Sequence, residues 1–165
     1  MSSQASGSMP KYARIQVLLH WTTVVLLLIS FFSHEAMKDA WRALRRGTEG
    51  FEPAIGTQVH VIVGILVLAL TAIRVVVRIT KGAPPPVEGQ SRLLTVLAAI
   101  VHGLLYVVLL AIPASGLAAW FGGITDAGEV HEVLFNLGLV LLLAHIGAAL
   151  FHQFVLKDRL LARMR

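Results

Sequence analysis

HEVLFNLGLVLLLAHIGAALFH, residues 131–152, is a nearly continuous apolar stretch that nonetheless carries three histidines. About 20 apolar residues in a helix suffice to cross the roughly 30 Å hydrocarbon core of a membrane. Polar side chains at that depth are costly and usually mark a functional path. The stretch therefore predicts a membrane-spanning helix whose histidines have a functional role.

Three more stretches are similarly long and apolar, so the sequence predicts an all-α integral membrane protein, a four-helix transmembrane bundle. Hydrophobic residues make up 56% of the 165 positions and the mean hydropathy is +0.77, so lipid is the expected solvent. The connections are a mixed-charge loop over 34–53, a proline turn at 84–86 and a glycine-rich acidic turn over 122–132. The expected spans are 15–33, 55–77, 93–120 and 133–156. They form one domain over 15–156, between an N-terminal tail, 1–14, and a C-terminal tail, 157–165.

Lysine and arginine indicate the orientation. The N-terminus, the second connection and the C-terminal tail hold ten of the 14 lysines and arginines, against four in the opposite loops. Because positive charge is usually in excess on the cytoplasmic side, both termini are expected in the cytoplasm, and the first loop in the periplasm of a bacterium. The expected location is the bacterial inner membrane. The charges lie between apolar runs and form no continuous basic face, so nucleic-acid binding is not expected.

The histidine spacing of the fourth span favours two haem groups. His131 and His145 are 14 residues apart, which is about 40° short of four helical turns and a rise of roughly 21 Å. They lie on one face at two depths, as two stacked haems would require of one helix. Gly138 is midway on this face, where its missing side chain could admit porphyrin edges or a neighbouring helix. Since the chain has no cysteine, a c-type attachment is excluded and any haem is held non-covalently.

Each haem iron needs a second imidazole from a facing helix. His60 opens the second span from the outer side, as His131 opens the fourth, so these two are expected to pair. On the inner side, His20 begins the first span and is expected to pair with His145. His152 is only seven residues from His145, roughly 10.5 Å, and is too close to serve a separate haem.

Other roles compete with haem ligation. A membrane histidine can bridge helices through a hydrogen bond or relay protons, and for His102 and His152 that interpretation is kept. Zinc is the main chemical rival because imidazole is its common ligand too. A zinc site would require clustered ligands, whereas these histidines are divided between two depths.

Short motifs accompany the histidines along all four spans. They are His20-Trp21; His60 and Gly64 on a helix ending in Arg74 and Arg78; His102-Gly103-Leu104-Leu105-Tyr106; Pro113-Ala114-Ser115-Gly116; His131-Glu132; and His152-Gln153-Phe154 before Lys157-Asp158. With these motifs the chain resembles the bacterial cytochrome b561 family over nearly its whole length. The resemblance implies a four-helix, di-haem b, quinone-linked cytochrome with bis-histidine ligation by His20, His60, His131 and His145. At Gln153 some relatives have a second histidine, so no role of a tandem pair is carried over.

Some members of the family resemble superoxide oxidases, which pass an electron from superoxide at the outer face through two haems to ubiquinone. Cations in the first loop fit this function, because they could steer a small anion. These cations are Lys38, Arg42, Arg45 and Arg46. Acidic residues in the same loop balance them, and an amphipathic surface helix would look similar. Candidates for holding the quinone or delivering protons are His102, His152, Arg74 and Arg78.

Two other functions stay open at this point. The chain could be a haem-bearing membrane anchor that accepts electrons from a dehydrogenase or hydrogenase subunit, although its short loops offer little docking surface. It could also be a non-redox transporter that uses its histidines as a proton relay.

Overall fold

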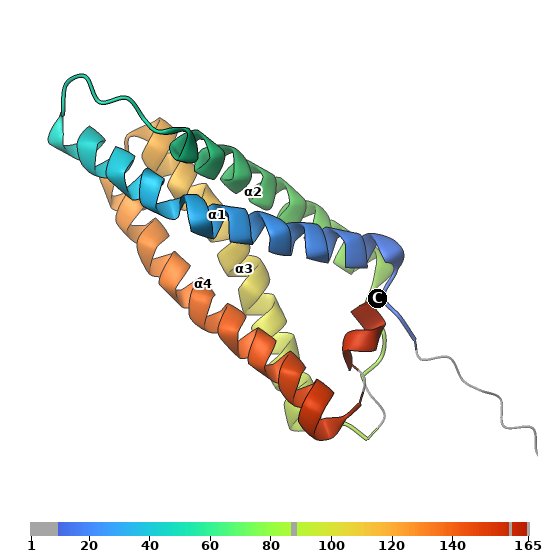
Figure 1. Cartoon of the computed structure of the whole chain (residues 1–165). Coiled ribbons are helices and arrows are strands. Elements are labelled where there is room, and N and C mark those ends of the chain that lie inside the picture. The colour runs from blue at the N-terminus through green and yellow to red at the C-terminus, as the bar shows by residue number, and fades with distance from the viewer. Residues whose placement is uncertain (1–9, 87–88, 159, 165) are drawn as a thin grey trace, which may run out of the picture.

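Four long helices make up the fold of the computed structural model, which describes residues 10–86, 89–158 and 160–164 (Figure 1). They are α1 (Arg14–Arg46), α2 (Ile55–Lys81), α3 (Arg92–Gly122) and α4 (Thr125–Phe151). A π-helical turn, η1 (His152–Leu156), and a 3-10 turn, η2 (Leu160–Met164), follow. All four helices are long and apolar enough to cross a membrane, and within the described ranges there is no strand. The predicted four-helix transmembrane bundle is confirmed.

The first connection is shorter than predicted, because α1 continues through residues 34–46 and only residues 47–54 join it to α2. The prediction of a loop over 34–53 was wrong for its first part. Segment 34–46 is rich in strong helix formers. Ion pairs one turn apart, Lys38 with Glu35 and Arg42 with Asp39, stabilise it further. The helix ends at Gly47, whose left-handed backbone (φ 61°) caps it.

The third connection is also shorter. Helix α4 begins at Thr125, so most of the predicted turn over 122–132 is helical. Gly123 (φ 66°) ends α3, and Asp126 lies in the first turn of α4, where a carboxylate is favourable beside the free amide groups. The acidic residues that suggested a turn thus mark the start of a helix that extends beyond the apolar span.

Neighbouring helices approach closely where small residues face them. The packed pairs are α1 with α2, α2 with α3 and α3 with α4. A Cβ atom on Gly56 would lie 2.7 Å from the Cβ of Ala36, and one on Gly138 would lie 3.0 Å from the Cδ1 of Ile112. Small residues commonly permit such contacts in membranes. Of the two alternatives for Gly138, the structure shows the neighbouring helix, α3.

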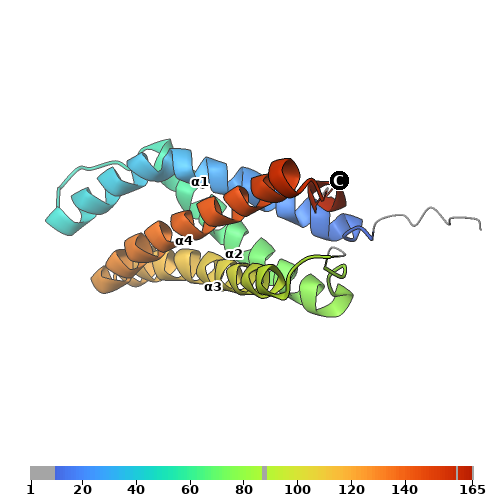
Figure 2. The ribbon, with the colours of Figure 1, turned by 90° about the horizontal axis from the view of Figure 1, so that it is seen from below.

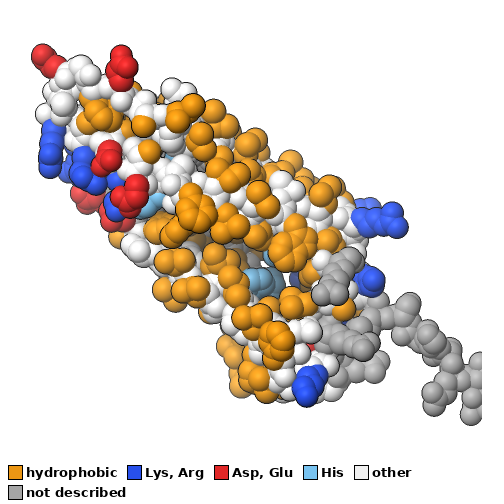
Figure 3. Space-filling model, viewed as in Figure 1, with side chains coloured by type: hydrophobic (Ala, Val, Ile, Leu, Met, Phe, Trp, Pro, Cys, Tyr) orange, Lys and Arg blue, Asp and Glu red, His pale blue; other side chains and the backbone are white. Residues whose placement is uncertain are grey.

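The two ends of the described chain lie at the same end of the bundle (Figures 1 and 2). The amide of Tyr12 donates to the carbonyl of Arg163 at 3.2 Å, so η2 packs beside the start of α1. Between α1 and α4 the surface is hollowed, and histidine side chains are visible inside the hollow (Figure 3). Most of the remaining surface in that view is apolar, as a lipid-facing surface should be. The side of the membrane that holds the termini stays a prediction.

Candidate functional site

Histidines gather at two levels of the bundle. The outer level, near the connection between α1 and α2, contains His60 on α2 and His131 on α4, with 6.3 Å between the ring centroids. The Nδ1 atom of His60 donates to the carbonyl of Ser30 at 3.1 Å, and that of His131 to the carbonyl of Ile112 at 2.6 Å. Since a carbonyl only accepts, Nδ1 carries the proton in each ring and Nε2 keeps a free lone pair. This is the tautomer of an anchored metal ligand.

The inner level, nearer the termini, contains His20 on α1 and His145 on α4, with 6.4 Å between the ring centroids. A metal ligated from opposite sides by two imidazoles, with bonds of about 2.0 Å, separates the ring centroids by about 6.3 Å. Both levels match this separation. His20 is held differently from the outer pair, because its Nδ1 accepts from Arg74 Nη2 at 3.3 Å. A neutral His20 ring in this arrangement carries its proton on Nε2, so ligation through Nε2 would require the proton to move to Nδ1 and the contact with Arg74 to change.

His102 of α3 joins the inner level. Its ring centroid is 5.1 Å from that of His145, shorter than the about 6.3 Å that suits two imidazoles on opposite sides of one metal, and its Nδ1 donates to the carbonyl of Ala98 at 2.5 Å. The spacing therefore favours His20 over His102 as the partner of His145. Within the described ranges, no three histidine or acidic side chains are grouped so that they could hold one metal ion.

His34 is a residue of the outer level that the sequence reasoning missed. Its ring lies 6.3 Å from His60 and stacks on Phe135 at 5.3 Å with an interplanar angle of 17°. A signal for it was present, because His20 and His34 are 14 residues apart, the interval that relates His131 to His145. His34 and His131 thus lie at the same distance from His60. The two rings differ in how they are oriented. A hydrogen bond to the carbonyl of Ile112 fixes the His131 ring, whereas no hydrogen bond to the His34 ring occurs among the described residues.

A cavity joins the outer histidines. Side chains from all four helices line it, and a Cβ atom on Gly64 would meet nothing within 4 Å there. The lining residues are Leu27, Ser30, Phe31, His34, His60, Gly64, Val67, Leu109, Ile112, Pro113, His131 and Phe135. An apolar wall, a glycine facing open space and two imidazoles with free Nε2 atoms fit the edge and the iron of a porphyrin.

Gly116 of α3 makes room for His131. A Cβ atom on Gly116 would lie 2.9 Å from His131 Nδ1 and 3.0 Å from Cε1. Any side chain there would push the ring away from the carbonyl of Ile112, which orients it. The Pro113-Ala114-Ser115-Gly116 motif therefore contributes directly to the outer level.

The family follows from a comparison over the whole bundle. The sequence model of the family described as prokaryotic cytochrome b561 matches residues 11–165 of this chain. This chain belongs to the prokaryotic cytochrome b561 family. It is therefore a multi-pass bacterial membrane haem protein, and the family implies that the haem is haem b.

Individual relatives agree with this membership. The chain is 42% identical to cytochrome b562 of Cereibacter sphaeroides, with 94% of this chain and 95% of the relative covered. It is 29% identical to a probable superoxide oxidase, CybB, of Yersinia pestis, with 93% and 95% covered. It is likewise 29% identical to cytochrome b561 homolog 1 of Escherichia coli, with 94% and 97% covered.

The inner arginines of this cytochrome b561 lie against aromatic rings. The guanidinium of Arg74 is 5.6 Å from the centroid of Tyr106, and that of Arg78 is 6.0 Å from the centroid of Tyr12. His152 is buried in η1, where its Nδ1 contacts the carboxylate of Asp158. Of the predicted quinone or proton residues, Arg74 and His102 are the two beside a ligand candidate of the inner level, Arg74 at His20 and His102 at His145.

Three of the four predicted anion-steering cations are paired with carboxylates. The N–O distances are 3.3 Å for Lys38 with Glu35, 3.2 Å for Arg42 with Asp39 and 4.0 Å for Arg45 with Glu129. All six side chains are at least 45% exposed, so solvent weakens each pair. The pairs reduce the local positive field and leave a helix end with mixed charge.

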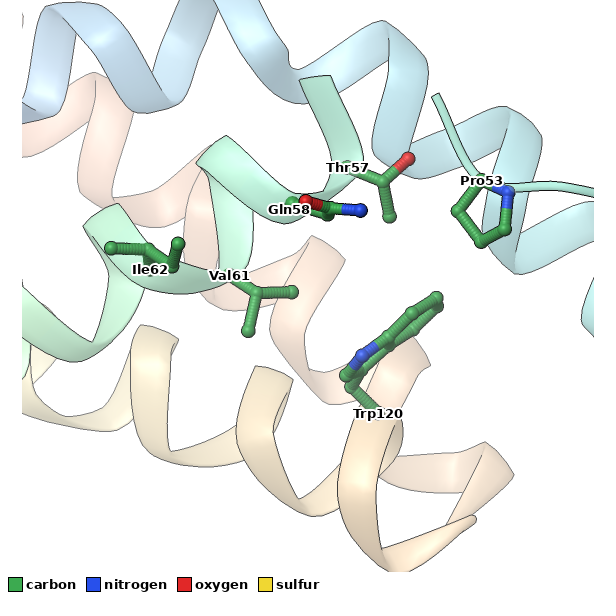
Figure 4. Close-up of a pocket in the computed structure, with 6 residues that line it drawn as sticks. All are labelled: Pro53, Thr57, Gln58, Val61, Ile62 and Trp120. Carbon is green, nitrogen blue, oxygen red and sulfur yellow. The ribbon is translucent and has the colours of Figure 1, made fainter. Parts of the chain in front are cut away.

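A second cavity, of about 310 Å³, lies between the start of α2 and the end of α3 (Figure 4). Its walls are Pro53, Thr57, Gln58, Val61, Ile62 and Trp120. None of the predicted site residues lines it. The candidate site of the protein is therefore the two histidine levels inside the bundle.

Proposed function

We propose that this cytochrome b561 is a transmembrane di-haem b electron carrier that moves electrons from superoxide at the periplasmic side to ubiquinone. His60 and His131 would hold the outer haem, and His20 and His145 the inner haem. The observation that carries the proposal is the matching separation of the two imidazole pairs, 6.3 Å and 6.4 Å, at opposite depths. When bound, haem b supplies one-electron redox chemistry at a potential set by its ligands and burial.

The fourth helix would set the distance between the two haems. His131 and His145 lie 14 residues apart on α4, which corresponds to roughly 21 Å along its axis. With both termini cytoplasmic and the chain in the inner membrane, the outer level faces the periplasm. Electrons would then cross most of the bilayer between the two pairs.

The assignment of superoxide as the electron donor rests on redox chemistry and on the name of one relative. Superoxide oxidised to O₂ releases one electron, and two such electrons with two protons reduce a quinone to a quinol. A relative of this chain is a probable superoxide oxidase. Lys38, Arg42, Arg45 and Arg46 would guide the anion, with a modest effect because three of them are paired.

The acceptor end is assigned to the inner level. Arg74 lies beside His20, and His102 lies beside His145. Either side chain could hold a quinone carbonyl or pass a proton to it. Arg78 and His152 are candidates of the same kind on the side of the termini.

The test uses the purified chain alone. Two haems b per chain, both low-spin in a reduced-minus-oxidised spectrum, and superoxide-dependent reduction of ubiquinone are expected. Protein that contains no haem, although made with ample haem supply, would overturn the proposal. If the chain holds two haems but reduces quinone only with a dehydrogenase or hydrogenase subunit present, it is an anchor and the superoxide role is wrong.

A further inference from the structure

Arg163, in the C-terminal tail, is a buried cation. Its exposed fraction is 6%. Nη1 donates to the carbonyl of Pro85 at 2.6 Å, whereas Nε is buried without a hydrogen-bond partner among the described residues. No salt bridge within those residues includes Arg163. A buried guanidinium without a counter-charge is costly, so this position calls for an anion.

The turn that carries Arg163 is connected to the inner level. The indole Nε1 of Trp21 donates to the carbonyl of Met164 at 3.2 Å, and the Trp21 ring lies edge-on to His20 with 5.2 Å between centroids. The amide of Tyr12 donates to the carbonyl of Arg163. In Figures 1 and 2, η2 lies between the start of α1 and the end of α4.

Two more cations surround the same region. Arg74 contacts His20, and Arg78 lies over the ring of Tyr12, the residue that bonds to Arg163. No salt bridge of the described residues includes either of them. The only described carboxylate on η1 and η2 or between them, Asp158, is engaged with His152. Among the described residues, the region around the inner level thus contains three arginines without a salt-bridge partner.

We propose that Arg163 binds a propionate carboxylate of the inner haem, and the proposal rests on the inner haem site proposed above. Haem b carries two propionates, and an arginine can bind a carboxylate through two parallel N–H donors. Nε of Arg163 is a buried donor without a partner among the described residues, and together with Nη2 it forms the side of the guanidinium that Pro85 does not occupy. A propionate would reach this side only where the protein atoms that cover it move apart. The C-terminal tail would then be part of the cofactor site, with the second connection held in place through Pro85.

Two other anions compete for this role. One is Glu88, which lies outside the described residues but close in sequence to Pro85. The other is a lipid phosphate at the membrane surface. Neither the Glu88 carboxylate nor a lipid phosphate is part of the haem. Esterifying the haem propionates would therefore leave both of these anions in place.

The experiment is a double-mutant cycle between the protein and the cofactor. Apo-protein in the His131→Ala background, in which only the inner site should bind, is titrated with haem b and with its dimethyl ester, which lacks the carboxylate charges. Arg163→Gln should weaken haem b binding about 10- to 100-fold and change ester binding little. Arg163→Lys, which retains the charge, should lose haem b affinity by a smaller factor and keep the protein folded. Arg14→Gln, an exposed arginine of α1 near the same end, is the matched control and should affect neither titration.

Several outcomes would overturn the assignment. Equal weakening of haem b and its ester by Arg163→Gln would mean that Arg163 supports the fold or a lipid. If Glu88→Gln changed the binding of haem b and of its ester as Arg163→Gln does, Glu88 would be the anion that pairs with Arg163, and the assignment to the propionate would be wrong. If the His131→Ala background itself binds no haem, the proposed inner site fails, and that result is independent of Arg163.

Discussion

Replacing Gly116 with alanine should displace His131 and weaken the outer haem site. The new Cβ would lie 2.9 Å from Nδ1 of His131 and 3.0 Å from Cε1, whereas non-bonded atoms are comfortable at about 3.5 Å. The ring must therefore move by about 0.6 Å, which exceeds the tolerance of about 0.5 Å within which a ligand site works. It would also leave the carbonyl of Ile112, its anchor at 2.6 Å. Loss of such an anchor typically lowers metal affinity about 10- to 100-fold.

The assay is haem content and spin state of the purified variant, followed by the rate at which haem passes to an excess of an apo-globin. One of two low-spin signals should weaken or become high-spin, and one haem should leave about 10 to 100 times faster. Gly103→Ala on the same helix is the matched control, because a Cβ atom there meets nothing within 4 Å. The reasoning is refuted if Gly116→Ala retains both signals and normal haem transfer, or if Gly103→Ala causes the same loss.

Three further predictions address the remaining parts of the site. His145→Ala should lose one low-spin haem while His102→Ala keeps both, as counted by a pyridine haemochrome assay; loss of a haem from the second variant would make the inner pairing wrong. Gly64→Leu should fill the outer cavity and lower haem content toward one per chain, whereas Gly147→Leu, also with open space at its Cβ, should retain two; equal content in both would show that the porphyrin lies elsewhere. Arg45→Gln should slow superoxide-dependent quinone reduction by about twofold at low salt, with the difference vanishing near 0.5 M salt; a difference that persists at high salt would argue against steering.

The fold was readable from the sequence because apolar length reports directly on the membrane. The four helices are 27 to 33 residues long, whereas about 20 residues cross the hydrocarbon core, and a helix satisfies its own backbone hydrogen bonds there. The ends of the helices were less predictable. Hydropathy falls where a helix leaves the lipid, but the helix itself need not stop. Residues 34–46 and 125–132 therefore read as loops although both are helical. In 34–46 the helix propensities and two ion pairs continue α1, and in 125–132 Asp126 lies in the first turn of α4.

The candidate site was predictable in outline and not in detail. Helical rise related His131 to His145, and the same rule would have related His20 to His34 had residue 34 not been placed in a loop. The anchoring of His131 by Ile112 depends on side-chain rotamers and on the space left by Gly116, which periodicity does not report. Arg163 was unreadable for another reason: its burial comes from contacts with Tyr12 and Pro85, both remote in the chain.

The extension of α1 beyond its apolar span bears on which donors could reach the outer histidines under the proposed function. From His34 to Arg46 it adds thirteen residues, so these two ends are roughly 18 Å apart along the helix axis. It packs on the start of α4, where Trp41 lies so close to Gly128 that a Cβ atom there would be 2.8 Å from its ring. Under the proposed function, a large protein resting on the tip of this projection would be kept a long electron-tunnelling distance from the outer histidines. A diffusible molecule of a few atoms would meet no such spacer, so the projection would favour small electron donors over large ones.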